Sequence, residues 1–161
     1  MPAVVFVPGG DIFQTQAQCL VNPVNCVGVM GAGLAKAFST RYPAILPPYQ
    51  RACRQGQFNP GGVQLLRLDP ESGLRDRDGS LLIANLATKL HWRDPSQLDW
   101  VERGLSVLAQ RLLERPVRSV AVPMLGAGLG GLDWALVRPV VVRTLTPCAS
   151  RGIEVQVLGP A

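Results

Sequence analysis

The stretch LVNPVNCVGVMGAGLAKAF, residues 20–38, decides the fold. Its apolar beginning predicts a buried strand from Cys19 to Val24. The following GAGLAKAFSTRY, residues 31–42, predicts a helix that begins at glycines and ends before Pro43. A strand that leads through glycines into a helix is typical of α/β domains.

The rest of the chain repeats this alternation. The apolar helical spacing after Ser96 indicates a long helix, and Ser96 and Asp99 resemble a capping box at its start. We expect Trp100 and Trp134 in the core, and a solvated turn over residues 69–79. The 161 residues suit one domain, 1–161, with a largely parallel sheet covered on both faces. Further strands are expected at residues 3–7, 62–68, 81–87, 119–123 and 153–158, and further helices at residues 45–54, 96–112 and 132–149.

Composition excludes several classes of protein. The four cysteines form no CxxC pair and the chain has one histidine, His91, so neither a structural zinc site nor a disulfide framework is expected. The beginning MPAVVFVPGGD does not have the pattern of a secretory signal, and no apolar run reaches the roughly 20 residues of a membrane span. We therefore expect a cytoplasmic protein with reduced thiols, no membrane partner and no cofactor.

Charge favours an anionic partner. Lys and Arg number 16 against 11 Asp and Glu, a formal net charge of +5. Only two of the cations are lysines, Lys36 and Lys89. A desolvated lysine can lose its proton and act as a nucleophile or base, whereas arginine cannot. The presence of these two lysines has two explanations: drift in codon usage, or a specific role for each lysine.

Two glycine-rich loops each join a predicted strand to a predicted helix, at residues 27–33 and 125–132. Glycines let a backbone approach a ligand closely, and the helix N-terminus that follows favours an anion. Neither loop has the GKS or GKT of a Walker A site, and neither completes a dinucleotide-binding fingerprint. One such loop is commonly a plain turn, but two at one sheet edge favour a cradle for a phosphate or diphosphate.

Polar residues follow the same strands. Asn22 and Asn25 close the second strand and suit hydrogen bonds to ribose hydroxyls, while Thr88 and Lys89 close the strand 81–87. Asp11 follows the first strand, where an aspartate either caps a helix or accepts a hydrogen bond from an adenine amino group.

Three segments together resemble a macrodomain: GDIF at 10–13, residues 20–38, and VPMLGAGLGGLDW at 122–134. The resemblance implies a three-layer α/β/α fold with a mixed, mostly parallel sheet and a cleft for ADP-ribose. It implies that Asp11 contacts adenine, Ile12 lies against it, Asn25 faces the distal ribose and the two loops wrap the diphosphate. The ligand-binding residues expected are Asp11, Ile12, Asn22, Gly28, Val29, Met30, Gly31, Gly33, Thr88, Gly126, Ala127, Gly128, Leu129, Gly130 and Gly131.

The segment NLATKLHWRDPSQLDWVERGL, residues 85–105, is similar to the bacterial DNA ADP-ribosyl glycohydrolase antitoxins, and more distantly to the animal terminal ADP-ribose protein glycohydrolase. The resemblance implies a monomeric hydrolase that removes ADP-ribose from thymidine in single-stranded DNA, with Lys89 and Asn25 catalytic. A cognate toxin, an ADP-ribosyltransferase, is the further partner that it implies. His91, Trp92 and Arg93 would contact a base or the DNA backbone. Alternatively, Trp92 packs under the following helix and His91 binds a loop carbonyl.

The sequence also departs from related hydrolases. Ala35 stands where the protein-directed macrodomain hydrolases have a catalytic aspartate, and Gly130 stands where the animal enzyme has one. Lys89 would then act as a nucleophile or as a stabilising cation. Two other functions stay open: a non-catalytic reader of ADP-ribose, and a hydrolase of ADP-ribosylated protein or O-acetyl-ADP-ribose.

Overall fold

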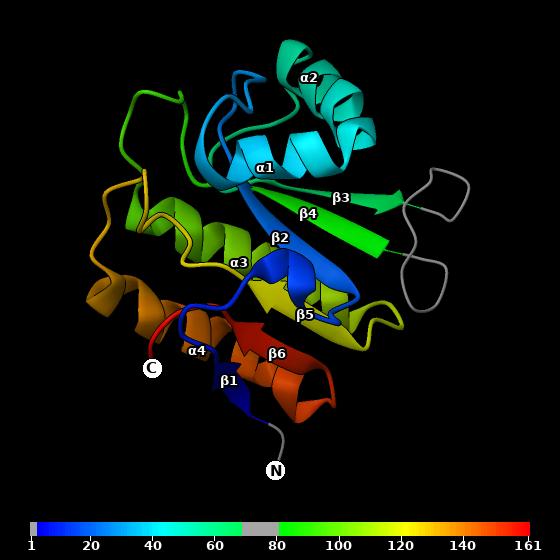
Figure 1. Cartoon of the computed structure of the whole chain (residues 1–161), viewed down its shortest axis with the longest axis vertical. Coiled ribbons are helices and arrows are strands. Elements are labelled where there is room, and N and C mark those ends of the chain that lie inside the picture. The colour runs from blue at the N-terminus through cyan, green and yellow to red at the C-terminus, as the bar shows by residue number, and fades with distance from the viewer. Residues whose placement is uncertain (1–2, 69–80) are drawn as a thin grey trace.

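The computed structural model describes residues 3–68 and 81–161, which form a sheet between helices (Figure 1). The turn predicted at 69–79 lies outside the described residues. The elements in chain order are β1 (Val4–Phe6), η1 (Ile12–Gln14), β2 (Cys19–Val24), α1 (Gly33–Arg41), η2 (Pro43–Ile45), α2 (Leu46–Arg54), β3 (Val63–Leu68), β4 (Leu81–Ala87), α3 (Leu98–Leu113), β5 (Ser119–Val122), α4 (Trp134–Ser150) and β6 (Glu154–Val157).

The sheet has six strands in the order β1-β6-β5-β2-β4-β3. Every neighbouring pair is parallel except β3 with β4, which is antiparallel. The expected mixed, mostly parallel sheet is therefore confirmed. β4 is buried along its whole length, as a central strand covered on both faces must be.

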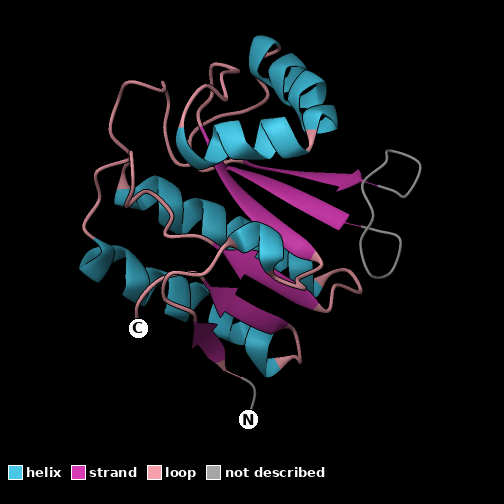
Figure 2. Ribbon diagram, in the orientation of Figure 1, coloured by secondary structure: helices cyan, strands magenta, loops and turns pink. Residues whose placement is uncertain are grey.

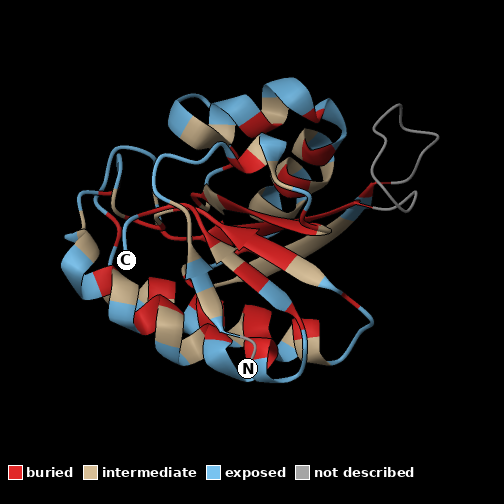
Figure 3. Ribbon diagram, turned by 60° about the horizontal axis from the view of Figure 1, so that its bottom comes forward, coloured by how far each residue is buried: buried red, intermediate tan, exposed pale blue. Residues whose placement is uncertain are grey.

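Helices cover both faces of the sheet, which makes three layers (Figures 2 and 3). α3 and α4 pack against each other on one face, and α1 and α2 cover the other. α3 lies so close to the sheet that a Cβ at Gly104 would be 2.5 Å from Leu86 Cδ2. The apolar core is accordingly divided by the sheet into two clusters. The α3–α4 cluster includes Val101, Leu105, Leu108, Val137, Val141 and Leu145, and the α1–α2 cluster includes Phe38, Ile45, Tyr49 and Phe58.

Two details differ from the sequence-based expectations. The predicted capping box is wrong, because α3 begins at Leu98 after Gln97 and no side chain caps it. Ser96 lies in the preceding loop, where its amide donates to the Gly130 carbonyl at 2.9 Å. Trp134 packs on the core while half-buried, but Trp100 belongs to neither apolar cluster.

α4 continues through Pro139 and Pro147 without ending. Asp133 caps it, since the Asp133 carboxylate accepts a hydrogen bond from the Ala135 amide at 3.0 Å. Over the described ranges 3–68 and 81–161, no helix combines the length and apolarity that crossing a membrane requires.

Candidate functional site

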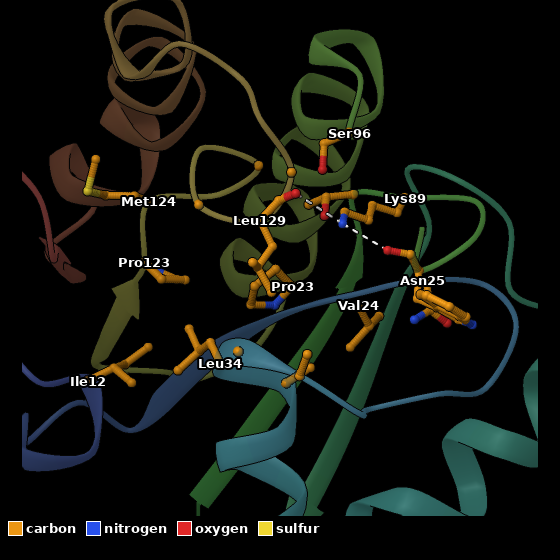
Figure 4. A pocket seen from close by; sticks show the side chains of 18 of the residues that line it. Ile12, Pro23, Val24, Asn25, Leu34, Lys89, Ser96, Pro123, Met124 and Leu129 are labelled. Carbon is orange, nitrogen blue, oxygen red and sulfur yellow. Dashed lines mark hydrogen bonds between the residues drawn. The ribbon is translucent and has the colours of Figure 1, made fainter. Parts of the chain in front are cut away.

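A cavity of about 600 Å³ opens at the edge of the sheet where the parallel strands end (Figure 4). The residues that follow β1, β2, β4, β5 and β6 all contribute to its wall, as expected for a ligand site in an open α/β sheet. The wall consists of Gly10, Asp11, Ile12, Pro23, Val24, Asn25, Val29, Gly31, Ala32, Gly33, Leu34, Ala35, Thr88, Lys89, Trp92, Ser96, Pro123, Met124, Gly126, Gly128, Leu129, Gly130 and Leu158.

Strand register brings the loops together. Val24, the last residue of β2, pairs with Ala87, the last residue of β4, so Asn25 and Thr88 emerge side by side. The Thr88 amide donates to the Val24 carbonyl at 3.0 Å and fixes this exit. β5 is the other neighbour of β2, so the second glycine loop emerges beside the first.

Asn25 organises the first loop. Its side-chain oxygen accepts from the amides of Val27 and Val29, at 3.0 and 3.4 Å, and its side-chain nitrogen donates to the Val29 carbonyl at 2.7 Å. The buried Tyr49 hydroxyl lies 2.8 Å from both oxygens of Asn25. Gly28, at a φ of 85°, lets the chain turn tightly around this side chain. The polar atoms of the Asn25 side chain are thus already engaged within the protein.

The first loop leads into an uncapped helix N-terminus. Ala32 is the N-cap of α1 and offers no side-chain hydrogen bond. The amides of Gly33, Leu34 and Ala35 therefore find no acceptor in the described part of the chain, and all three residues line the cavity. Free amides at a helix N-terminus attract an anion such as a diphosphate.

The second loop offers a matching set of amides. Gly128, Leu129 and Gly130 line the cavity, and their amides have no acceptor among residues 3–68 and 81–161. Gly126 adopts a φ of 72°, and a Cβ at Gly130 would lie 2.3 Å from Ser96 Oγ and 2.5 Å from the Gly126 carbonyl oxygen. This loop conformation therefore excludes any side chain at position 130. A Cβ at Gly128, by contrast, would meet no atom within 4 Å.

Lys89 joins two walls of the cavity. Its ammonium donates to the Trp92 carbonyl at 3.1 Å and to the Leu129 carbonyl at 3.2 Å (Figure 4). An ammonium carries three hydrogens, so one remains for a ligand. Figure 4 shows Lys89 beside Asn25 at one end of the cavity and Ile12 at the other.

The cavity wall contains two charged side chains, Lys89 and Asp11, among the described residues. Asp11 caps η1, with its Oδ1 accepting from the Phe13 amide at 2.9 Å. Its carboxylate still has acceptor positions for a ligand. A cation and an anion therefore occupy separate parts of a mostly apolar wall.

Some of the residues proposed from sequence lie outside this wall. Asn22 is fully buried within the sheet and donates to Asn85 Oδ1 at 3.0 Å. Trp92 lines the cavity and is 54% exposed, so it does not pack under α3. The His91 ring accepts from the Arg93 amide at 3.3 Å rather than binding a loop carbonyl. The residues outside the wall are Asn22, Gly28, Met30, Ala127, Gly131, His91 and Arg93.

Other wall residues were not predicted from the sequence as part of the site. Pro23, Pro123 and Met124 are apolar or cyclic residues at strand ends, and Leu158 follows β6. Ser96 is buried, and its hydroxyl has no hydrogen-bond partner among the described residues. Only the fold reveals such positions, because their side chains offer no recognisable chemistry.

Two thiols lie beneath the first loop, away from the cavity. Burial raises the pKa of Cys26 to about 12, and it also raises the pKa of Cys53. Both thiols are therefore neutral at physiological pH, and neither has the depressed pKa of a nucleophilic cysteine.

Comparison with known proteins agrees with this geometry. Residues 21–141 match the family model for the Macro domain. The DNA ADP-ribosyl glycohydrolase of Mycobacterium tuberculosis is 43% identical over 125 residues, 78% of this chain and 34% of the relative. The enzyme of the same name from Thermus aquaticus is 40% identical over 151 residues, 94% of this chain and 40% of the relative. The chain thus spans about a third to two fifths of the length of these relatives.

Solved structures are similar over nearly the whole chain. The macrodomain of Mycobacterium tuberculosis DarG has a TM-score of 0.87 and 36% identity, with 100% of both chains covered. Thermosipho africanus DarTG in complex with ADP-ribose has a TM-score of 0.86 and 32% identity, covering 98% of this chain and 42% of that one. The six-stranded sheet, the cleft at its edge and the family match together show that this chain belongs to the Macro domain family.

Proposed function

We propose that the protein is an ADP-ribosyl glycohydrolase that removes ADP-ribose from thymidine in single-stranded DNA. The names of its relatives support DNA as the modified molecule, since those from Mycobacterium tuberculosis and Thermus aquaticus are called DNA ADP-ribosyl glycohydrolases. A Thermosipho africanus relative, 34% identical, is named as a fusion of a DNA ADP-ribosyl transferase with such a glycohydrolase. This fusion supports a cognate transferase as a partner of the present chain.

We infer one direction for ADP-ribose in the cavity. The free amides of α1 and of the second loop suit the diphosphate, while Asp11 and Ile12 suit the adenine. The distal ribose would then lie toward the end of the cavity where Figure 4 shows Asn25 and Lys89. Its C1″ carries the bond to be hydrolysed, so that bond faces the lysine.

The position of Lys89 is the single observation that carries the proposal. In the reaction, a water oxygen bonds to C1″, the bond from C1″ to the thymine nitrogen breaks, and the proton of the water goes to the departing base. Negative charge develops on the base as the bond breaks. The remaining hydrogen of the Lys89 ammonium would stabilise that charge, while the Trp92 and Leu129 carbonyls hold the ammonium in place.

No carboxylate stands at the two positions where related hydrolases have a catalytic aspartate. Position 35 is alanine, and position 130 accommodates no side chain. Asn25 would act through the loop that it organises, because its side-chain atoms hold Val27 and Val29. Positioning of the ribose and diphosphate would then supply much of the rate enhancement.

Substitution of Lys89 tests the proposal. Lys89→Ala should reduce the release of ADP-ribose from thymidine-modified single-stranded DNA by about a hundredfold or more, the scale on which one electrostatic group acts. Affinity for free ADP-ribose should stay within a few-fold, because backbone amides hold the diphosphate. Lys36→Ala is the matched control, since Lys36 is exposed on α1 and does not line this cavity. Wild-type turnover by Lys89→Ala would contradict the lysine mechanism.

Lys89→Arg distinguishes between the two roles of the lysine. Arginine keeps the charge but cannot supply a neutral amine. An active arginine variant would support the stabilising cation, and an inactive one would support a nucleophile or base.

A reader of ADP-ribose is the second candidate. It is favoured by the engagement of Asn25 and Lys89 with protein atoms and by the presence of Asp11 as the one carboxylate in the described wall. A reader and a hydrolase bind ADP-ribose alike, so affinity does not separate them. Turnover of modified oligonucleotide, modified protein and O-acetyl-ADP-ribose, compared side by side, does separate them.

A further inference from the structure

The net positive charge of this protein comes from one part of the chain. Residues 12–68 contain five cations and no aspartate or glutamate, while the remaining residues contain eleven of each sign. The whole formal net charge of +5 therefore belongs to the segment from η1 to β3, which includes α1, α2 and the first loop. The cations are Lys36, Arg41, Arg51, Arg54 and Arg67, and all five are exposed.

Two of these cations, Arg51 and Arg54, lie on α2, which packs against the first loop. Gln50 Nε2 donates to the Gly28 carbonyl at 3.2 Å, and Gly28 packs against Gln50 and Cys53. Arg54 lies one turn after Gln50 and so faces the same side of α2. Arg51 stands one turn before Arg54 and extends this row. Neither arginine has an ion pair within the described ranges.

Three exposed apolar side chains lie on the first loop and on the loop after β4. Val27, Leu90 and Trp92 are 44%, 49% and 54% exposed, which is unusual for such large apolar residues grouped together. The Cys26 amide donates to the Leu90 carbonyl at 3.0 Å, so the first loop and the loop after β4 form one surface. Trp92 also lines the cavity, and its carbonyl accepts a hydrogen bond from Lys89.

We propose that Arg51, Arg54, Val27, Leu90 and Trp92 form a strand-binding surface that holds the single-stranded nucleic acid on either side of the modified nucleotide. This inference rests on the proposed function. Phosphates would lie on the two arginines and an unstacked base on Trp92, a combination typical of proteins that bind single strands. An acidic peptide would pair with the two arginines. Its carboxylates would make no favourable contact with the exposed apolar side chains of Val27, Leu90 and Trp92.

The experiment compares two substrates and two charge reversals. Arg51→Glu/Arg54→Glu alters the proposed surface. Arg115→Glu/Arg151→Glu is the control with an equal change of charge, because both residues are exposed and follow α3 and α4, at the sheet edge opposite the cavity. Each variant acts on ADP-ribosylated thymidine nucleoside and on a modified single-stranded oligonucleotide of about twelve nucleotides, within the range that such surfaces cover. Thermal unfolding establishes that each variant folds.

We expect Arg51→Glu/Arg54→Glu to lower kcat/KM on the oligonucleotide at least tenfold relative to the control, and to leave kcat/KM on the nucleoside unchanged. The slope of log affinity for the unmodified strand against log salt should become shallower by about 1.4, since two phosphate contacts are lost. Trp92→Ala should also lower kcat/KM on the oligonucleotide more than kcat/KM on the nucleoside.

Three results would overturn the inference: equal activity of both charge reversals on the oligonucleotide, equal losses on both substrates, or competition by polyglutamate as effective as that by unmodified strand. Failure of the wild-type protein on both substrates would instead contradict the proposed function. In that case, salt-dependent strand binding that Arg51→Glu/Arg54→Glu abolishes would still support the surface, and unaltered strand binding would refute it.

Discussion

Gly130→Ala should disrupt the second loop although it adds a single methyl group. The new Cβ would lie 2.3 Å from Ser96 Oγ and 2.5 Å from the Gly126 carbonyl oxygen. Ordinary contact begins near 3.4 Å, so the loop must move by about 1 Å. The Ser96 side chain can rotate, but the Gly126 carbonyl is fixed by its hydrogen bond from the Leu132 amide at 2.8 Å. The methyl should therefore cost about 1–3 kcal/mol of unfolding free energy.

The same displacement should reach the ligand. It would move the Leu129 carbonyl away from Lys89, and it would misplace the amides of Gly128 and Gly130. We expect the Kd for ADP-ribose to rise about tenfold, equivalent to roughly 1.4 kcal/mol. Urea unfolding measures the stability, and titration calorimetry measures the affinity.

Gly128→Ala is the matched control within the same loop. A Cβ there meets no atom within 4 Å, and neither glycine has a positive φ. The control should therefore be at least as stable as the wild type, because alanine restricts the unfolded chain more than glycine does. Equal stability and equal ADP-ribose affinity of the two alanine variants would refute the reasoning.

Two further predictions concern the ligand and the thiols. ADP-ribose at a hundredfold excess over its Kd should raise the Tm by roughly 5–10 °C, and Gly128→Glu, which fits the open space but places a carboxylate beside the diphosphate, should remove that shift in a thermal scan. No shift for the wild type would count against ADP-ribose as the ligand. Burial raises the pKa of Cys19 and of Cys26 from 9.0 to about 12, so the folded state holds these protons more tightly than the unfolded state. Stability from this source is complete below pH 9 and declines as the pH rises toward 12. Urea midpoints at pH 8 and pH 10.5 measure the decline, and equal midpoints would contradict it.

The sequence was most informative where apolar runs are continuous. Residues 19–24 and 81–87 were predicted as strands with the bounds that the structure has, because both lie in the centre of the sheet and are almost wholly buried. The start of α3 was misplaced because the Ser96 amide donates to the carbonyl of Gly130, 34 residues later in the chain. No local pattern contains that partner.

The site was predictable only in part, for reasons of register. Asn22 and Asn25 are both polar residues near the end of β2, and sequence gives them the same role. The register places Asn22 opposite Asn85 inside the sheet, whereas Asn25 follows the last paired residue and reaches the cavity. Leu158 illustrates the converse, since it enters the wall only because β6 is a parallel neighbour of β5.

The contact between Tyr49 and Asn25 has a consequence for communication across the molecule. Tyr49 belongs to α2 and is fully buried, and its hydroxyl meets both oxygens of Asn25. A tilt of α2 must therefore be transmitted to the first loop, which would border the distal ribose in the proposed complex. If a strand bound on α2 favours one position of that loop, ADP-ribose in the cavity must strengthen strand binding by the same factor, because such coupling is reciprocal. Tyr49→Phe, which removes the hydroxyl and keeps the ring, would uncouple the two binding events.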